Sequence, residues 1–382
     1  MKRVAMFGAA LLLIAGVPGA TAGPGTHGVT SDGVEHIEFV PFEIGTATGA
    51  KVVGEHLYVT SWKSFSIYDI SDPLAPEQLS QTPFGFKFEN ENVSTNGEIM
   101  LFAEQAPVDS LHVWDVEDKT NPTEIAVLDG AGSHTATCIL DCKYSYGTYD
   151  FVGPEGPSSG ATLVDLRDPA KPKELGHWNA KLKFDKVHDV TEVAPGRVVT
   201  ASMPIAYVDA RKNPLHPEAL AYGTNMDKRE HSVVWPRGGK DRFIMSSFET
   251  NATPRCEAGV GAFTVWDASN WKKSKTFTVL DEWYITNGTW VDGRPGVSAP
   301  LGCSPHWFEE HPDFRNGGIV AVGFYDHGTR FLEISGKGKV SEVGYFLPWR
   351  GSTSAAYWVT DEIVYSIDYE RGIDILRFKG AK

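Results

Sequence analysis

A short pattern that recurs seven times along the chain constrains its fold more than any other sequence feature. Each copy is a strand-length run of apolar residues that ends in a polar turn, often with a proline close behind. The copies begin at Phe65, Leu111, Ala161, Ile205, Phe263, Thr329 and Ile373. Their spacings are 46, 50, 44, 58, 66 and 44 residues, and a four-stranded propeller blade repeats about every 40–45 residues. The repeat therefore predicts an all-β chain folded as a seven-bladed β-propeller.

The repeat also predicts how the ring closes. A second apolar strand precedes most copies, such as Leu57–Thr60 and Ile363–Ser366, so each blade has an inner, a second, an anchor and an outer strand. The last copy ends at Phe378, where its outer strand would begin. The strand-like segment His36–Ile44 stands before the first blade, and we expect it to supply the missing strand. Such closure removes exposed sheet edges, which otherwise invite aggregation.

The N-terminus has the features of an export signal. Two basic residues follow Met1, an apolar run extends from Ala5 to Ala20, and Ala20-Thr-Ala22 is a small-residue cleavage pattern. We expect a signal peptide over residues 1–22, a flexible tail over 23–35 and one propeller domain over 36–379. The apolar run is too short for a spanning helix, and no later segment is long enough. These features predict a secreted or extracytoplasmic protein that does not insert into a membrane.

The charge of the chain narrows the classes of partner. Its formal net charge is −14. Nucleic acids and anionic membranes both require a basic surface, so the charge argues against them as partners. A small molecule or a glycan is the expected substrate class, and the protein is expected to be a monomer.

The four cysteines predict two disulfides, because an even number in an exported chain is typical of disulfide pairing. Cys256 and Cys303 lie in loops on one face of the expected disc, which favours a bond between them. Cys138 and Cys142 flank a tight turn on the opposite face and are expected to bridge it. Thiolate ligation of a metal is the alternative use of these residues.

One anchor and its turn resemble a known repeat. The stretch Ser66-Ile-Tyr-Asp-Ile-Ser-Asp-Pro-Leu-Ala-Pro76 is similar to the LVIVD repeat of bacterial secreted β-propellers. The resemblance spans nearly the whole expected mature chain; it is strong at the first three anchors and degenerate at the last three. It implies a propeller fold and very little about activity, because fold alone does not determine function.

Four of the twelve histidines occupy the same place in four consecutive repeats, at the start of the innermost strand. They are His134, His188, His231 and His306. Innermost strands line the channel of a propeller, so these four side chains should converge there. Neutral imidazole is the commonest transition-metal ligand, and the set favours iron or copper, with zinc possible. Iron held by four histidines on a seven-bladed propeller is also the geometry of carotenoid oxygenases, although no other resemblance to them is found. Hydrogen-bonded structural roles are the alternative.

Other residues are expected around this ring. Glu91 begins an inner strand and is a candidate fifth ligand or base. Asp189 and Glu230 neighbour two of the histidines but point away by strand alternation, so they are expected to support them from behind.

The loops that overhang the histidines supply further candidates, because functional residues concentrate in loops on rigid scaffolds. Tyr149, Arg255 and His327 are the candidate catalytic residues from these loops, with Tyr325 and Arg330 nearby.

These features support three hypotheses. The first is a secreted metal-dependent enzyme of the oxidoreductase or oxygenase type, in which the metal acts as a Lewis acid or activates dioxygen. The second is a metal-independent polysaccharide lyase that uses His134, His188, Tyr149 and Arg255. The third is a non-catalytic extracellular binding scaffold. The sequence has no phosphate-binding glycine loop, nucleophile elbow or His-Glu-x-x-His motif.

Overall fold

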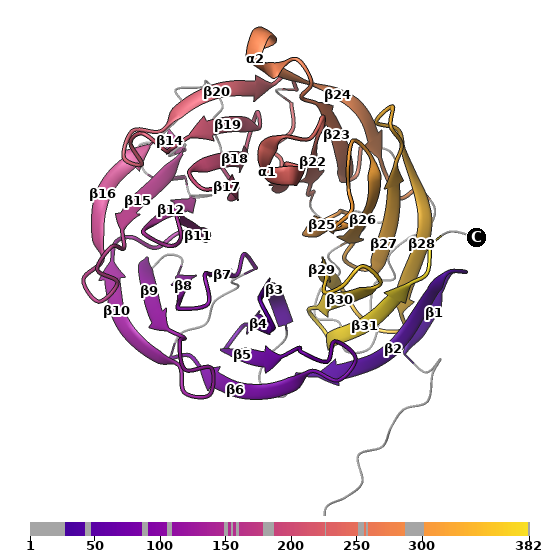
Figure 1. Ribbon diagram of the computed structural model, residues 1–382, viewed down its shortest axis with the longest axis horizontal. Coiled ribbons are helices and arrows are strands. Elements are labelled where there is room, and N and C mark those ends of the chain that lie inside the picture. Colours follow the sequence, from indigo (N-terminus) through magenta and orange to yellow (C-terminus); the bar gives the residue numbers. More distant parts are fainter. Residues whose placement is uncertain are drawn as a thin grey trace, which may run out of the picture.

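The computed structural model consists of antiparallel sheets arranged in a ring around a central channel (Figure 1). It describes residues 27–42, 47–85, 91–104, 109–148, 152–153, 156–157, 160–178, 187–225, 227–250, 256, 259–286 and 302–380. Within these ranges two short helices occur, α1 (Pro236–Gly239) and α2 (Trp271–Ser274). The all-β propeller prediction is therefore confirmed, while the count of seven blades stays a prediction made from the repeat.

The described strands run from the channel to the rim in the order of the sequence. The first sheets contain β3 (Ala47–Val53), β4 (His56–Ser61), β5 (Ser64–Asp69) and β6 (Glu77–Pro83); β7 (Ser94–Thr95), β8 (Ile99–Ala103), β9 (Ser110–Asp115) and β10 (Thr123–Asp129); and β11 (Thr135–Ile139), β12 (Tyr144–Thr148), β15 (Ala161–Asp165) and β16 (Lys173–Trp178). A separate hairpin comprises β13 (Val152–Gly153) and β14 (Gly156–Pro157).

The following sheet has eight strands, because two four-stranded units share one edge. They are β17 (Asp189–Ala194), β18 (Arg197–Ala201), β19 (Ala206–Asp209) and β20 (Glu218–Gly223), and β21 (Ser232–Val234), β22 (Phe243–Phe248), β23 (Ala262–Asp267) and β24 (Thr276–Trp283). The outer strands β20 and β24 pair in parallel through Tyr222 with Thr276 and Gly223 with Phe277.

The last sheets bring the two ends of the described chain together. They contain β25 (Phe308–Glu310), β26 (Gly318–Gly323), β27 (Thr329–Ile334), β28 (Val340–Pro348) and β1 (Gly28–Thr30), and β29 (Thr353–Trp358), β30 (Ile363–Asp368), β31 (Gly372–Phe378) and β2 (Val34–Pro41). The strand β2 pairs with β31 as its outer neighbour, so the N-terminal segment supplies the missing strand as expected. β1 adds a fifth strand beside β28 and lies within residues 23–35, where a tail was expected, because the free edge of β28 offers it backbone partners.

The anchor pattern marks the third strand of each unit, and its acidic residue explains the turn that follows. The carboxylates of Asp69, Asp115, Asp165, Asp209 and Asp267 each accept a hydrogen bond from the backbone N–H two residues further on. Such a turn stabilises a sharp change of direction at the end of a strand. The repeat is therefore conspicuous in the sequence because these five units share the same turn.

The hydrophobic core lies between neighbouring sheets. Phe65 of β5, for example, packs against Phe102 of β8 and Trp114 of β9, with ring centroids 5.2 Å apart in both pairs. All three side chains are buried. Such aromatic packing fixes one sheet on the next and holds the inner strands in a constant register around the channel.

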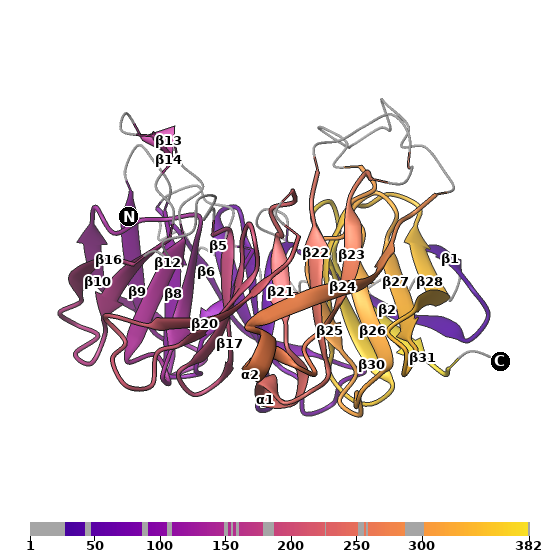
Figure 2. The same ribbon diagram turned by 90° about the horizontal axis from the view of Figure 1, so that it is seen from above.

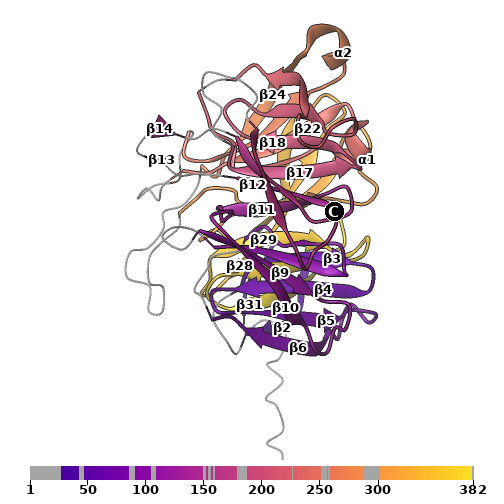
Figure 3. The ribbon, with the colours of Figure 1, turned by 90° about the vertical axis from the view of Figure 1, so that its left-hand side faces the viewer.

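The two faces of the disc carry different elements. The β13–β14 hairpin stands on one face, and α1 and α2 lie toward the opposite one (Figures 2 and 3). Both expected disulfides are present, Cys138–Cys142 and Cys256–Cys303. Among the described residues, no helix has the length and apolar character needed to cross a membrane.

Candidate metal centre in the channel

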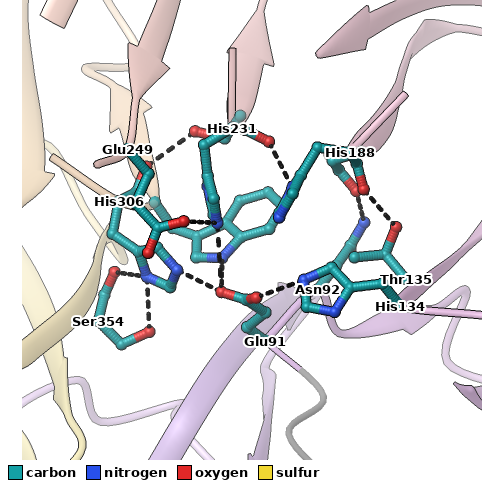
Figure 4. Close-up of polar contacts among 12 residues, drawn as sticks. Glu91, Asn92, His134, Thr135, His188, His231, Glu249, His306 and Ser354 are labelled. Carbon is teal, nitrogen blue, oxygen red and sulfur yellow. Dashed lines mark hydrogen bonds and ion pairs between the residues drawn. The ribbon is translucent and has the colours of Figure 1, made fainter. Parts of the chain in front are cut away.

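Each of the four histidines is held at the start of an inner strand by the same backbone contact. The N–H of His134, His188 and His231 donates to a carbonyl at the end of the neighbouring second strand, at 2.8, 2.8 and 2.7 Å. The N–H of His306 donates in the same way to Gly323 at 2.8 Å. The equal register predicted from the sequence is thus present, and the four imidazoles point into the channel (Figure 4).

Hydroxyl groups of one blade fix the histidine of the next. Thr148 Oγ1 donates to the carbonyl of His188 at 2.6 Å, and Thr135 lies beside it at 3.3 Å from the same carbonyl. Ser247 Oγ donates to the carbonyl of His306 at 2.7 Å. These buried contacts define where each histidine backbone lies relative to its neighbour, and so they position the ring as a whole.

The imidazoles form a continuous arc. The ring centroids of His134 and His188 lie 4.6 Å apart, those of His188 and His231 4.0 Å apart, and those of His231 and His306 4.2 Å apart. The side chains of His188, His231 and His306 are almost completely buried. Four imidazoles at this spacing cannot all be charged, because like charges in a buried site repel strongly.

Glu91 lies at the centre of the arc. One carboxylate oxygen is 2.9 Å from His134 Nε2, and the other contacts His306 Nε2 and accepts a hydrogen bond from the Trp307 indole at 3.0 Å. The Nε2 atom of His231 is 3.6 Å from this second oxygen. Glu91 is 4 % exposed. The expectation that it faces the channel is met, with contacts to three of the four imidazoles.

A glycine allows the chain to place Glu91 there. A Cβ atom at Gly49, in the neighbouring strand β3, would lie 2.0 Å from the Glu91 carbonyl oxygen, closer than atoms can approach. Because Gly49 has no side chain, the backbone at Glu91 can lie directly against β3. This position brings the Glu91 carboxylate into the channel.

Hydrogen bonds to backbone carbonyls fix the orientation of two imidazoles. His188 Nδ1 lies 3.0 Å from the carbonyl of His231, and His306 Nδ1 lies 2.8 Å from the carbonyl of Ser354. A carbonyl can only accept, so Nδ1 carries the proton in both rings, and in the neutral form Nε2 presents a lone pair to the channel. This is the arrangement that metal-ligating histidines usually show.

The charges at the centre divide between one ion pair and neutral imidazoles. Burial opposes ionisation of Glu91, but the nearby His306 and His231 outweigh it and hold the pKa of Glu91 well below its usual value. Burial lowers the pKa of His306, but Glu91 more than reverses this effect, so the pKa is raised. Burial and adjacent imidazoles lower the pKa of His188 and of His231. At neutral pH these last two rings are therefore uncharged.

A second carboxylate, which the sequence analysis missed, completes the centre. Glu249 Oε2 lies 3.8 Å from His231 Nε2, and its other oxygen accepts a hydrogen bond from the Tyr325 hydroxyl at 2.5 Å. The Tyr325 ring lies 4.6 Å from that of His306. Burial, followed by the charge of Glu249, raises the pKa of Tyr325, so its hydroxyl remains a proton donor.

The position of Glu249 along its blade could have identified it from the sequence. It lies two positions beyond Ser247, which accepts the N–H of His231, and Tyr325 lies two positions beyond Gly323, which accepts that of His306. Glu249 and Tyr325 are thus equivalent in two successive blades. Tyr325 also adopts φ of 38°, a left-handed conformation that is uncommon for a non-glycine residue and clusters at functional sites.

The donor atoms form two overlapping groups that could hold an ion. The first comprises Glu91, His188 and His231, and the second His231, Glu249 and His306; within each group, the potential ligand atoms lie within 4.8 Å of one another. Because His231 belongs to both, it is the central ligand candidate.

The remaining predicted residues lie elsewhere. Asp189 and Glu230 turn away from the ring as expected, and both are buried. Asp189 accepts a hydrogen bond from Asn92. Among the described residues, neither carboxylate forms a hydrogen bond with an imidazole of the ring. The outer hydrogen bonds of His188 and His306 go to backbone carbonyls instead. Tyr149 and Arg255 lie outside the described residues.

His327 contacts a disulfide rather than the ring. Its Nε2 atom lies 2.9 Å from Cys256 Sγ and 3.6 Å from Cys303 Sγ. These three residues also have the proximity of a metal site, but the two sulfurs are bonded to each other and are not thiolates. The neighbouring Arg330 donates to the carbonyl of His327 and pairs with Glu342.

A cavity of about 540 Å³ occupies the other end of the channel. It is lined by Lys51, Asn92, Asp189, Tyr357 and Trp307, among others. Trp307 also donates its indole N–H to Glu91, so this one side chain joins the cavity to the histidine ring.

Comparisons with known proteins support the fold and leave the activity open. No family model matches the chain, and no curated protein matches its sequence. Among solved structures, the β-propeller domain of Cps50 (Swd1) from Myceliophteria thermophila is similar, with a TM-score of 0.58. The match covers 88 % of this chain and 98 % of that one, with 14 % identical residues. Similarity at this level of identity shows a β-propeller and carries no information about function.

Proposed function

We propose that the protein binds one transition-metal ion between its channel histidines and Glu91, and that it is a metal-dependent enzyme of the oxidoreductase type. The observation that carries this proposal is the proximity of imidazole nitrogens and carboxylate oxygens in two overlapping groups of three, within each of which the atoms lie within 4.8 Å of one another. Two of these imidazoles are neutral and one is fixed with its lone pair toward the centre, which is the state that ligation requires.

The side chain of His231 supports a bound cation over a purely structural network. Both of its ring nitrogens are buried, and neither has a hydrogen-bond partner in the described part of the chain. An unsatisfied buried polar atom costs about 1–3 kcal/mol, and such atoms are rare in native proteins. Its Nε2 atom lies between Glu91 and Glu249, so a cation there would satisfy the nitrogen and both carboxylates together.

The donor set favours iron or copper, with zinc possible. Imidazole suits all three metals, and two histidines with one carboxylate and open positions are typical of non-haem Fe(II) oxygenases. The group formed by Glu91, His188 and His231 has this composition. When bound, such a metal would supply Lewis acidity or dioxygen activation.

The protein supplies a proton donor beside the proposed metal. Tyr325 donates its hydroxyl hydrogen bond to Glu249, whose side chain is 32 % exposed. We therefore assign this pair to proton transfer during turnover. The same inference places a small molecule or a glycan as substrate on this face of the disc.

The anchors also support a proposal about the family of the protein. Their acidic turns occur at the third strand in sheet after sheet, which supports membership among secreted LVIVD-repeat propellers. We propose on this basis that the protein is exported and acts as a monomer in an oxidising compartment, where its two disulfides persist.

Metal analysis tests the proposal. We expect protein purified from its export compartment to contain about one equivalent of iron, copper or zinc, and the His188→Ala/His231→Ala variant to contain almost none. The matched control is His177→Ala/His216→Ala, which removes two exposed histidines outside the channel and should retain the metal. Azide binding to the metal-loaded protein then reports an open coordination position. Metal-free protein that fails to bind added metal contradicts the proposal, and a metal that azide cannot reach contradicts the catalytic part of it.

The hydroxyl contact behind His188 should tune metal affinity. In Thr148→Val the shape of the side chain is kept but the hydrogen bond to the His188 carbonyl is lost. We expect metal affinity to fall, because the backbone of a proposed ligand loses one of the contacts that position its imidazole. Competition with a chromophoric chelator measures the change. The control Thr329→Val removes a buried hydroxyl pair with Ser366 that touches no histidine, and an equal loss in both variants contradicts the assignment.

A further inference from the structure

A second cavity lies apart from the channel. It has a volume of about 820 Å³, within the size range of ligand sites. Residues of α1 and α2 line it, and these two helices lie toward one face of the disc (Figures 2 and 3). Its walls come from strands and turns of the two units that share the eight-stranded sheet, and Asn316 also lines it. The histidine ring faces the other side of the disc.

The charge of this cavity is opposite to that of the chain. Six basic side chains line it, whereas the chain as a whole has a formal net charge of −14. They are Arg197, Arg211, Lys240, Arg242, Lys272 and Lys273. The one acidic lining residue is Asp241, and its two carboxylate oxygens accept backbone N–H groups from Phe243 and Asn316 at 3.0 and 2.8 Å. Asp241 is thus occupied in holding the turn.

Neighbouring carboxylates neutralise only part of this charge. Asp209 pairs with Arg211, and Asp267 pairs with Arg242. Within the described residues, the other four basic side chains have no carboxylate at ion-pair distance; these are Arg197, Lys240, Lys272 and Lys273. A cluster of uncompensated cations is unfavourable in the free protein, and an anionic ligand would relieve the repulsion.

An aromatic wall stands among these cations. Trp271 is half-buried and packs edge-on against Tyr207 at 5.0 Å and Trp235 at 6.0 Å, measured between ring centroids. Trp235 is buried and donates its indole N–H to the Asp241 carbonyl at 2.9 Å, which fixes the wall. The ammonium of Lys272 lies 5.9 Å from the centroid of a Trp271 ring. A rigid, partly exposed indole with cations beside it suits a ligand with both a ring and negative groups.

We propose that this cavity binds an acidic oligosaccharide. Its carboxylate or sulfate groups pair with Arg197, Lys272 and Lys273, and one sugar ring lies against Trp271. The exposed side chains of Ser269 and Asn270 are placed to bond sugar hydroxyls. Because the histidine ring opens on the other face, binding here would hold the protein on a polyanionic glycan and leave the channel accessible.

Calorimetric titration with defined oligosaccharides tests this inference. The ligands are a uronate oligomer, a sulfated oligomer and a neutral oligomer of equal length. We expect one or both acidic oligomers to bind, with affinity that falls as salt is added, and the neutral oligomer to bind at least about tenfold more weakly. The arm that binds more tightly identifies the anionic group.

Two variants and a control make the test specific. Lys272→Glu/Lys273→Glu changes only exposed side chains and should reduce affinity more than about tenfold, and Trp271→Ala should do the same. Lys171→Glu/Lys173→Glu makes the same charge change at two exposed residues on another sheet, one in the turn before β16 and one at its first position, and should leave affinity unchanged. Metal content should stay normal in all three. Equal loss in the control, equal binding of the neutral oligomer, or no binding of either acidic oligomer would overturn the proposal.

Discussion

In metal-free protein, replacement of Glu91 with alanine is expected to lower the free energy of unfolding by about 3 kcal/mol, in the range found when one partner of a buried ion pair is removed. The variant leaves His306 without its counter-ion and the Trp307 indole without an acceptor. Both groups are buried, so water cannot replace the lost contacts. Urea unfolding with a chelator present measures the change.

The size of this loss should depend on pH in a defined way. The depressed pKa of Glu91 means that its stabilisation is present above its ordinary value of 4.5 and is lost as the pH falls through the folded-state pKa. The raised pKa of His306 means that its stabilisation is present below 6.5 and is lost as the pH rises through the folded-state pKa. The difference between wild type and Glu91→Ala should therefore be largest between these two values.

Suitable comparisons separate the ion pair from general effects of substitution. Glu117→Ala removes an exposed carboxylate and should change stability by less than about 0.5 kcal/mol. Glu91→Gln keeps an acceptor for Trp307 and should lose less than Glu91→Ala. A loss in Glu91→Ala that is small and independent of pH would show that Glu91 and His306 are not paired.

Removal of the Cys256–Cys303 disulfide is the second change with a large expected effect. The bond joins residues 47 apart in the sequence. A loop of this length restricts the unfolded chain enough to contribute about 4 kcal/mol in the chain-entropy relation, and the variant Cys256→Ser/Cys303→Ser should lose about that much. Chemical denaturation under non-reducing conditions measures the loss.

The other disulfide provides the internal control. Cys138 and Cys142 are only four residues apart, so the same relation gives about 2 kcal/mol for Cys138→Ser/Cys142→Ser. Because Cys303 stands three residues before His306, we also expect the first variant, but not the second, to weaken metal binding. Equal losses of stability would mean that loop length does not determine the contribution of either bond.

The fold was predictable because its determinants repeat. Five anchors end in the same acidic turn, and four inner strands begin with the same backbone contact, so the pattern recurs at blade spacing in the sequence. For the same reason the four histidines were found, since equal register in a ring means convergence. Glu91 was found by its place at the start of an inner strand.

Features without a repeated signature were harder to predict. Tyr325 was named as a neighbour of the site from its loop, but Glu249 was missed, because two different residue types at one register in two blades do not form a visible pattern. His327 was misplaced because the turn that carries it bends the imidazole toward the disulfide. The basic cavity draws on turns from several places in the sequence, and only folding brings Arg197 and Lys272 together.

X-ray absorption at the metal edge tests the central claim most directly. For the protein purified with its metal, the structure predicts scattering by imidazole rings together with nitrogen and oxygen ligands at about 2.0–2.2 Å, and loss of the metal in His188→Ala/His231→Ala. Sulfur scattering at about 2.3 Å would instead place the metal at Cys256, Cys303 and His327. That result, or a spectrum without imidazole scattering, would contradict a metal centre in the histidine ring.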